Sequence, residues 1–548
     1  MMRWKLMVGM SMLALGAGTA GAQTTTNTSE VSQTGTNNSA AVDNNRAGND
    51  QNRSTVIQNG RQNNVQVLQI GDFNGSQVRQ IGDNNLIVHT SRGDANNTES
   101  LQSSNSNRSA IRQAGEGQNG SVSQDGDRNL SQIAQGVDAG SNSNFDTNGF
   151  FDPLNGTARA GNGNRATVSQ VGDDFSSTIR QRASSSGVSA GDNRATVRQR
   201  GRGNGSEIVQ ESRGNSATVL QFEGGTTSQT RNSTSITQQN MGATASNNPL
   251  SNNQANVAVT GQGNSSTVTQ NGLNNIARVS QGLGQGSSTR ISQTGSGESN
   301  RAAVGQYGSS NVVTIGQNSV AASASVWQQM TSGNSEASIT QGTGGTGSPD
   351  SFSGSFFGNV AGPSGDQTRN LSANITQGGR FNVGLIRQDG LDLTASIRQL
   401  GSGTESLRSI ARIAQQGQAN SAAAIQQADV GPSGPNAFDH APTGQRGDEF
   451  YFDGGARSAE ITILQSGSSN SATVEQRGRG QFARIEQGPG SGNVASILQD
   501  VAAANATAVI RQTGSNNSYN VVQTAGRQYI VVNQTGNNNG VTDVVQRP

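Results

Sequence analysis

The sequence predicts an all-β fold, a β-solenoid of stacked strand-turn-strand rungs with the cross-β spacing of an amyloid. Three observations favour it: from Gln58 onward a glutamine returns every eleven residues, a glycine follows that glutamine by two residues, and an asparagine follows it by five. Such a fixed period is typical of arrays in which each unit buries its core only against its neighbours. Two half-repeats would make one rung of about 22 residues.

Each half-repeat is predicted to begin with a strand of about six or seven residues. In the segment 164–170, which reads NRATVSQ, Asn, Ala, Val and Gln fall on one face and Arg, Thr and Ser fall on the other. This alternation is typical of a half-buried strand. The glycine that follows supplies the backbone freedom for a tight reversal. The predicted turn glycines are Gly60, Gly71, Gly82, Gly93, Gly115, Gly126, Gly172, Gly201, Gly272, Gly308, Gly390, Gly467, Gly478, Gly514 and Gly536.

The recurrent amides are predicted to face the interior and to bond to their own copies one rung away, which forms continuous amide ladders. Because a buried amide without a partner is costly, such ladders require every rung to keep the same register. The predicted ladder residues are Gln58, Asn63, Gln69, Asn74, Gln80, Asn85, Gln113, Gln124, Asn129, Gln135, Asn164, Gln170, Asn193, Gln199, Gln210, Asn215, Gln221, Asn264, Gln270, Gln281, Gln306, Gln317, Gln388, Gln399, Asn470, Gln476, Gln512, Gln523 and Gln534.

The composition limits the other fold classes. Of 548 residues only 30% are hydrophobic and 4% are aromatic, too few to bury the several cores that this length would otherwise predict. The net charge of +1 leaves little repulsion to keep the chain open. A disordered Gln/Asn linker is the competing interpretation, but random polar sequence would not keep Gly and Asn at fixed distances from Gln.

The chain is predicted to consist of a leader and one long array. Residues 1–22 have a charged start, an apolar stretch and a small-residue cleavage site, which is typical of a secretory signal peptide. A short segment, 23–32, precedes the repeat array at 33–548. Loops are predicted to interrupt the array near 136–163, 240–256, 342–370 and 428–460. These loops collect prolines and phenylalanines, and they either fold back over the solenoid or form surfaces for adhesion or lateral fibre contact.

The repeat resembles that of a known family. The pattern Gln58-x-Gly60-x-x-Asn63-x5-Gln69 is similar to the Ser-x5-Gln-x-Gly-x-x-Asn-x5-Gln repeat of the curlins, the subunits of curli amyloid fibres on bacterial surfaces. Here asparagine mostly replaces the leading serine, so that the period falls towards eleven residues, and the repeats are several times more numerous than in typical curlins. The segment between the predicted leader and the first repeat glutamine, Gln33, is also shorter than the family's export segment.

The resemblance implies a function and a location. It implies that the Gln and Asn positions lie in a fibre core and drive polymerisation, so that the chain is a secreted structural subunit for surface adhesion and biofilm matrix. It also implies an extracellular fibre of a Gram-negative-type bacterium. The implied partners are further copies of the chain, a nucleating subunit and an outer-membrane export channel.

Two other function classes are weighed against this one. A monomeric β-solenoid adhesin or ice-binding rod is the main alternative, although an ice-binding face would need flat Thr rows that the variable outward positions do not form. A polysaccharide lyase of the parallel β-helix type would need a carboxylate and basic cluster that no repeat offers. With only His89 and His440 and no cysteine, we expect no catalytic, cofactor or metal site. We also expect neither nucleic-acid binding nor membrane insertion.

Overall fold

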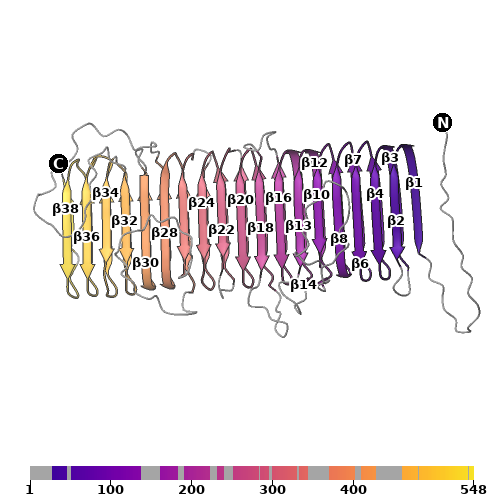
Figure 1. Cartoon of the computed structure of the whole chain (residues 1–548). Coiled ribbons are helices and arrows are strands. Elements are labelled where there is room, and N and C mark those ends of the chain that lie inside the picture. The colour runs from indigo at the N-terminus through magenta and orange to yellow at the C-terminus, as the bar shows by residue number, and fades with distance from the viewer. Residues whose placement is uncertain are drawn as a thin grey trace, which may run out of the picture. The chain divides into compact units, whose positions relative to one another are not determined.

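The structure is a computed structural model that describes residues 27–45, 51–136, 161–182, 190–222, 231–239, 251–282, 284–294, 299–329, 332–342, 369–401, 409–427, 459–478, 480–540 and 542–547. The chain divides into two compact units, Met1–Asn253 and Gln254–Pro548. In each unit the described residues form strands joined by turns, and the strands stack in parallel (Figure 1). The predicted all-β solenoid is therefore confirmed. The described residues contain no helix long and apolar enough to cross a membrane.

Unit 1 has two parallel sheets, called sheet A and sheet B, to which successive strands contribute in turn. In order of pairing, its sheet A contains β1 (Thr28–Thr36), β3 (Arg53–Arg61), β5 (Gly75–Ile81), β7 (Asn97–Ser103), β9 (Asn119–Asp125), β12 (Arg165–Asp173), β15 (Arg194–Arg202) and β17 (Ser216–Phe222). Its sheet B contains β2 (Ser39–Asn45), β4 (Asn64–Ile70), β6 (Leu86–Arg92), β8 (Arg108–Glu116), β10 (Leu130–Gln135), β13 (Ser176–Arg182), β16 (Gly205–Glu211) and β18 (Ser233–Gln239). The short strand β11 (Gly161–Asn162) pairs with the last two residues of β8, and β14 (Ala190–Gly191) pairs with β11.

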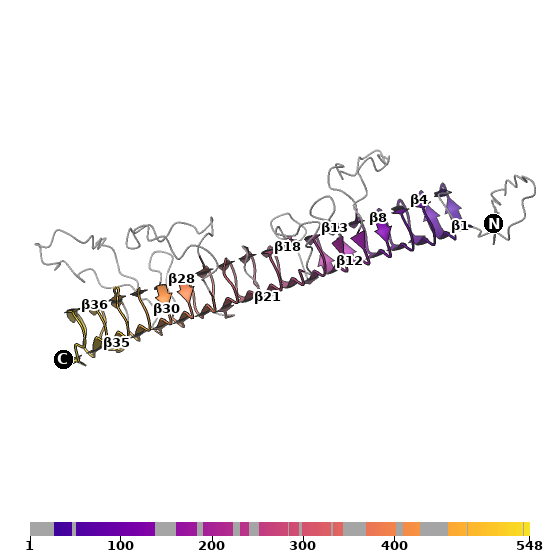
Figure 2. The ribbon, with the colours of Figure 1, turned by 90° about the horizontal axis from the view of Figure 1, so that it is seen from below.

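Unit 2 repeats this arrangement. Its sheet A contains β19 (Gln254–Thr260), β21 (Ile276–Gly282), β23 (Arg301–Tyr307), β25 (Ser323–Gln328), β27 (Ser372–Gln377), β29 (Thr394–Gln399), β31 (Ser421–Gln426), β33 (Ser471–Gln476), β35 (Val494–Gln499), β37 (Ser518–Gln523) and β39 (Thr542–Gln546). Its sheet B contains β20 (Ser265–Asn271), β22 (Ser288–Gln293), β24 (Val312–Gln317), β26 (Glu336–Gln341), β28 (Asn382–Leu391), β30 (Ser409–Gln418), β32 (Glu460–Gln465), β34 (Phe482–Gln487), β36 (Thr507–Thr513) and β38 (Tyr529–Thr535). Figure 2 shows sheets A and B on opposite sides of each unit.

The core lies between the two sheets and is thin. In β12 the burial alternates, so that Ala166, Val168 and Gln170 are buried and the residues between them are partly exposed. Parallel register repeats this pattern in the next strand, where Val168 pairs with Val197 and Gln170 with Gln199. Most of the described strands therefore contribute an alanine or serine, one β-branched residue and one glutamine to the interior. The β-branched residues pack on their own copies above and below.

The register is kept across the predicted loops. Residues 137–160, 240–250, 343–368 and 428–458 lie outside the described part of the chain, so most of each predicted loop is not described. The strands on either side nevertheless pair directly, because β9 pairs with β12 and β25 pairs with β27. The predicted signal peptide also lies outside the described residues. Three strands begin inside predicted loops, β11 at Gly161, β19 at Gln254 and β32 at Glu460.

Candidate functional site: stacked amide ladders

The glutamines of sheet A in unit 1 form one continuous chain of side-chain hydrogen bonds. Gln58 Nε2 donates to Gln80 Oε1 at 2.9 Å, and Gln80 Nε2 donates to Gln102 Oε1 at 3.0 Å. The same bond joins each following pair, at 2.7 to 2.9 Å, through Gln124, Gln170, Gln199 and Gln221. Each of these bonds lies inside the solenoid, where water does not compete for the amide.

Both sheets of unit 2 and sheet B of unit 1 contain equivalent ladders. In sheet B of unit 1 the ladder joins Gln113, Gln135, Gln181, Gln210 and Gln238. In sheet A of unit 2 it joins Gln281, Gln306, Gln328, Gln377, Gln399, Gln426, Gln476, Gln499, Gln523 and Gln546. In sheet B of unit 2 it joins Gln270, Gln293, Gln317, Gln341, Gln388, Gln415, Gln465, Gln487, Gln512 and Gln534.

The glutamine ladders have a direction. In every bond the Nε2 of one rung donates to the Oε1 of the next rung towards the C-terminus. The second proton of the same nitrogen is donated to a backbone carbonyl at the start of the neighbouring strand, as from Gln80 to Asn64 O at 3.2 Å and from Gln102 to Leu86 O at 3.2 Å. Because a carbonyl can only accept, this second bond fixes which way each amide points.

The structure buries the predicted ladder residues, with one exception. All of them have at most 1% of their surface exposed apart from Gln534, which is half-buried in β38, the last described strand of sheet B. Gln69 is buried but accepts from the Ser54 hydroxyl at 2.8 Å. Burial leaves each amide dependent on protein partners, and an amide that loses one pays a desolvation cost of about 1–3 kcal/mol.

The sequence predicts that the asparagines bond to their own copies through two side chains. Such bonds occur in unit 2, where Asn493 Nδ2 donates to Asn470 Oδ1 at 3.1 Å and Asn539 Nδ2 donates to Asn517 Oδ1 at 2.7 Å. Asn63 and Asn74 in unit 1 do not bond in this way. Instead the backbone N–H of Asn85 donates to Asn63 Oδ1 at 3.1 Å, and Asn63 Nδ2 donates to the backbone carbonyl of Gly82 at 2.8 Å. The same two bonds recur at Asn74 and Asn96. The asparagine side chain is shorter than that of glutamine and lies where the backbone turns. There it forms hydrogen bonds with peptide groups that have no partner in the sheet.

The turns combine two residues in the left-handed region. All the predicted turn glycines except Gly478 have positive φ, for example 130° at Gly60 and 108° at Gly82. A Cβ on Gly60 would overlap the carbonyl oxygen of Gly82. The residue immediately before the turn asparagine is also left-handed, with φ of 57° at Gln62 and 60° at Asn84. The sequence analysis missed this second position. Its signal is the frequent Gly or Asn there, since these residues adopt that conformation at the least cost.

Gly478 departs from the predicted turn pattern. It is not among the glycines with positive φ, and the nearest atom to a Cβ placed on it is Gln481 Nε2, at 2.6 Å. Gln481 stands where other turns have asparagine, and its Nε2 donates to the carbonyl of Asp500 at 2.7 Å. A Cβ at residue 478 would therefore collide with the Gln481 amide.

One pair of rungs in unit 1 interrupts the pattern. His89 of β6 occupies the β-branched position, between Val67 and Ile111 in register, and it is buried. Its Nδ1 lies 2.8 Å from Ser76 Oγ and its Nε2 lies 2.7 Å from Ser100 Oγ. Burial lowers the pKa of His89 to about 3, so the ring is neutral at ordinary pH. The imidazole and the two serine hydroxyls bonded to it are all buried in the core, so they lie where no substrate can reach them.

Ser91 and Ser100 extend the same interruption. Ser91 stands in the glutamine column of sheet B, and its hydroxyl contacts Gln113 Oε1 at 3.4 Å, a weaker bond than the amide bonds elsewhere. Ser100 stands in the β-branched column of sheet A, between Val78 and Val122. The backbone register through these strands is unchanged.

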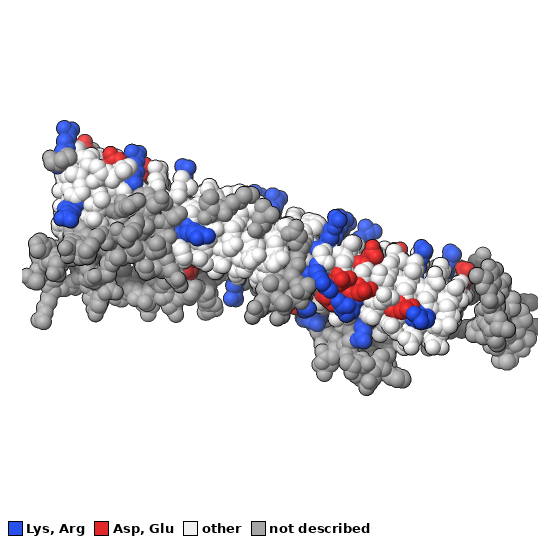
Figure 3. All heavy atoms as spheres, turned by 90° about the horizontal axis from the view of Figure 1, so that it is seen from above, with Lys and Arg blue, Asp and Glu red and all other residues white. Residues whose placement is uncertain are grey.

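The charges form pairs at the turns and on the outer faces. Arg128 Nε lies 2.7 Å from Asp174 Oδ1, and this hydrogen bond lowers the pKa of Asp174. Arg202 also contacts Asp174, at 3.4 Å. Figure 3 shows this mixture of blue and red side chains gathered over one part of unit 1. Such exposed pairs contribute little to stability. Because opposite charges lie on successive rungs here, this part of unit 1 has no strong electrostatic potential of one sign.

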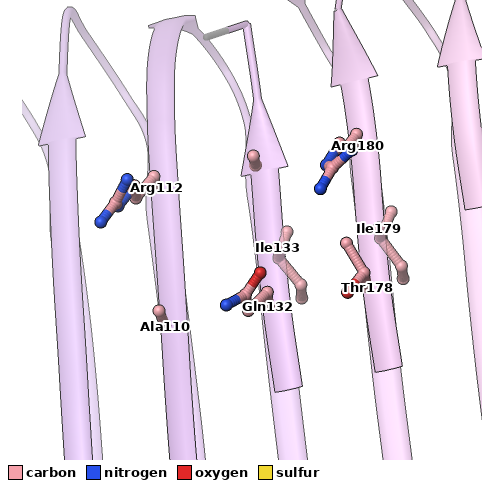
Figure 4. Close-up of a pocket in the computed structure, with 8 residues that line it drawn as sticks. Ala110, Arg112, Gln132, Ile133, Thr178, Ile179 and Arg180 are labelled. Carbon is pink, nitrogen blue, oxygen red and sulfur yellow. The ribbon is translucent and has the colours of Figure 1, made fainter. Parts of the chain in front are cut away.

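A shallow depression lies on the outer face of sheet B in unit 1. Ala134 separates Arg112 and Arg180 in register, and its small side chain leaves the space between the two guanidinium groups (Figure 4). Gln132 and Thr178 line the same depression. It contains no carboxylate, histidine or paired nucleophile, and no group of three or more metal-ligating side chains occurs in the described chain.

Comparison with known proteins agrees with the repeat geometry. A family model described as the curlin associated repeat matches residues 368–401 and 457–488. These segments include β27 to β29 and β32 to β34, where the glutamine ladders of unit 2 run without interruption. No curated protein matches the chain. The chain carries repeats of the curlin type.

Proposed function

We propose that the chain is a secreted structural subunit that polymerises edge to edge into curli-like extracellular amyloid fibres, used for surface adhesion and in a biofilm matrix. The observation that carries the proposal is the continuous pairing of backbone and glutamine amides from rung to rung. Nothing in that pattern limits the number of rungs, so another copy of the chain can extend it. The curlin-type repeats support a structural role, and no observation favours catalysis.

The edge strands have the groups that such growth requires. Among the described residues, β1 pairs with β3 alone and β39 pairs with β37 alone. The directional ladder ends in Gln33, which donates to Gln58 at 2.6 Å and so directs its Oε1 towards the open side. At the other edge Gln546 accepts from Gln523. An amide donor at one edge and an acceptor at the other favour head-to-tail contact between copies over contact between like edges.

The proposal extends to the setting of the fibre. By their resemblance to curlins, the copies would leave the cell through an outer-membrane channel and would start growth on a nucleating subunit. The fibre would then lie on the surface of a Gram-negative-type bacterium. The ladder glutamines would hold the core of that fibre, as they hold each unit.

A substitution in β1 tests the edge directly. Thr28 N–H donates to Asn52 O and Thr36 C=O accepts from Gln62 N–H, so even-numbered residues of β1 bond to β3. Odd-numbered residues then direct their N–H to the open side, because alternate residues of a parallel strand face the same neighbour. Val31→Pro removes one such N–H without removing a bond to β3. Val31→Ala retains the N–H and is the matched control.

The chain expressed from Gln23 should form fibres with a meridional reflection at about 4.7 Å. We expect Val31→Pro to slow seeded growth at least tenfold and Val31→Ala to grow nearly as fast as the natural chain, with unchanged circular dichroism of both soluble proteins. A natural chain that remains monomeric for days at micromolar concentration would contradict polymerisation and would favour a monomeric adhesin. Equal growth of the two variants would contradict the edge mechanism.

A further inference from the structure

An exposed aromatic pair lies on the outer face of sheet A in unit 2. Trp327 of β25 is 47% exposed, although the residues beside it in register are small or polar: Gly305 of β23 and Thr376 of β27. Tyr307, at the end of β23, contacts Trp327 with ring centroids 5.1 Å apart and planes inclined at 52°. Large apolar side chains are usually buried, and an exposed aromatic cluster on a polar face often marks a binding site.

Two glycines allow both rings to lie against the sheet. A Cβ on Gly305 would overlap the six-membered ring of Trp327, and a Cβ on Gly282 would lie 2.8 Å from Tyr307 Cε1. Each ring therefore covers the glycine of the preceding rung. Tyr307 Oη lies 3.4 Å from Ser280 Oγ, which anchors its free end. We call Trp327, Tyr307, Gly282 and Gly305 the aromatic platform.

The surroundings of the platform are rich in hydroxyl and amide groups. Ser325 stands two residues before Trp327 on the same strand, and its hydroxyl donates to Asn374 Oδ1 of β27 at 2.9 Å. Ser323 and Ser372 continue this polar surface at the starts of their strands. Such groups can replace the water that a polyhydroxylated ligand loses on binding.

Basic side chains lie on both sides of the platform. Arg278 of β21 stands two rungs before Ser325 in register, and Arg398 of β29 stands two rungs after Trp327. Two rungs separate the backbones of each pair by about 10 Å. Both arginines are exposed, as is Arg301 at the start of β23. The outward positions of β21, β23, β25, β27 and β29 contain no aspartate or glutamate. This part of the face is therefore positively charged.

We propose that the aromatic platform binds an acidic polysaccharide, a chain of pyranose rings that carry carboxylates. The flat apolar face of a pyranose matches the exposed face of Trp327, its hydroxyls match Ser325 and Asn374, and its carboxylates match the arginines. A single-stranded nucleic acid also stacks on aromatic rings. It would need a basic groove that follows its phosphates, whereas this face is open and has few arginines.

The chain contains a natural reporter for this site. Its two tryptophans are Trp4 and Trp327, so the chain expressed from Gln23 retains Trp327 alone. Titration with an oligogalacturonate should change the tryptophan fluorescence in a saturable manner. In co-sedimentation with polygalacturonate, we expect Trp327→Ala to bind at least tenfold more weakly. Arg278→Gln with Arg398→Gln should weaken binding and reduce its salt dependence.

The controls separate the possible ligands. Ile57→Ala removes a side chain of similar exposure, 43%, from the outer face of sheet A in unit 1, and it should bind as the natural chain does. Equal binding by Trp327→Ala with unchanged circular dichroism would overturn the proposal. Equal or tighter binding of a neutral glucan, of polyaspartate or of a single-stranded oligonucleotide would also overturn it. Binding is measured on soluble or assembled chain alike, so the result does not depend on polymerisation.

Discussion

The rungs around β6 and β7 and those around β20 to β24 have the same backbone and different interiors. In β20 to β24 the core column is Val268, Ile291 and Ile315, and the amides bond from Gln270 to Gln293 at 2.8 Å without interruption. Around β6, the imidazole of His89 and two serine hydroxyls take positions in these columns. The register is identical in both regions. We conclude that polar residues in the core of one rung leave the register of the strands unchanged.

The largest expected effect comes from breaking the regular region. Replacing Gln270, Gln293 and Gln317 by alanine removes consecutive ladder bonds and leaves buried neighbours without partners, at about 1–3 kcal/mol each. We expect the β signal in circular dichroism to be lost at a clearly lower denaturant concentration. The matched control changes Thr269, Ser292 and Thr314, on the outer face of the same strands, to alanine. If both triple variants unfold alike, the ladder does not stabilise this region.

The second expected effect is a dependence on pH in the interrupted region. In the folded chain His89 has a pKa of about 3, and in the unfolded chain it has its ordinary value of about 6.5. Between these two pKa values the unfolded state binds more protons than the folded state, so the free energy of unfolding rises with pH. The contribution of neutral His89 to that free energy is fully present above about pH 6.5. Acidification from pH 7 towards pH 3 should therefore weaken unit 1 by several kcal/mol at most.

Amide hydrogen exchange in β6 and β7 measures this effect locally. His89→Ile, which reproduces the residue at Ile111, should remove the pH dependence of exchange in these strands. The rungs of β20 to β24, which contain no histidine, serve as the internal reference. A pH dependence that persists in His89→Ile would assign the effect to other groups.

The smallest expected effect is a gain from repairing the ladder. Ser91→Gln places an amide between Gln69 and Gln113 in register and should stabilise unit 1 by about 1 kcal/mol. Ser103→Gln adds the same side chain at an outward position of β7 and should leave the denaturant midpoint unchanged. A loss of stability in Ser91→Gln would show that this rung has no room for the amide.

The spacing of Gln and of the β-branched residues was enough to predict the fold, because both lie in strands with period two and both repeat at a fixed distance. The bonding of Asn63 could not be predicted, since an inward amide is equally able to reach a side chain or a peptide group. The left-handed residues before each turn asparagine were missed because their identity varies, from Gln62 to Phe73 to Asn84. The platform at Trp327 depends on Gly305, which belongs to another rung, and only the register brings the two together.

The pairing of strands across long intervening segments has a consequence for how such chains can diverge. Gln328 donates to Gln377, 49 residues later, with the same geometry as rungs that are 22 residues apart, such as Gln377 and Gln399. A turn can therefore accept a foreign segment of several tens of residues while the scaffold folds as before. New surface properties can be acquired or discarded at these places by insertion and deletion, without any change to the residues that build the stack.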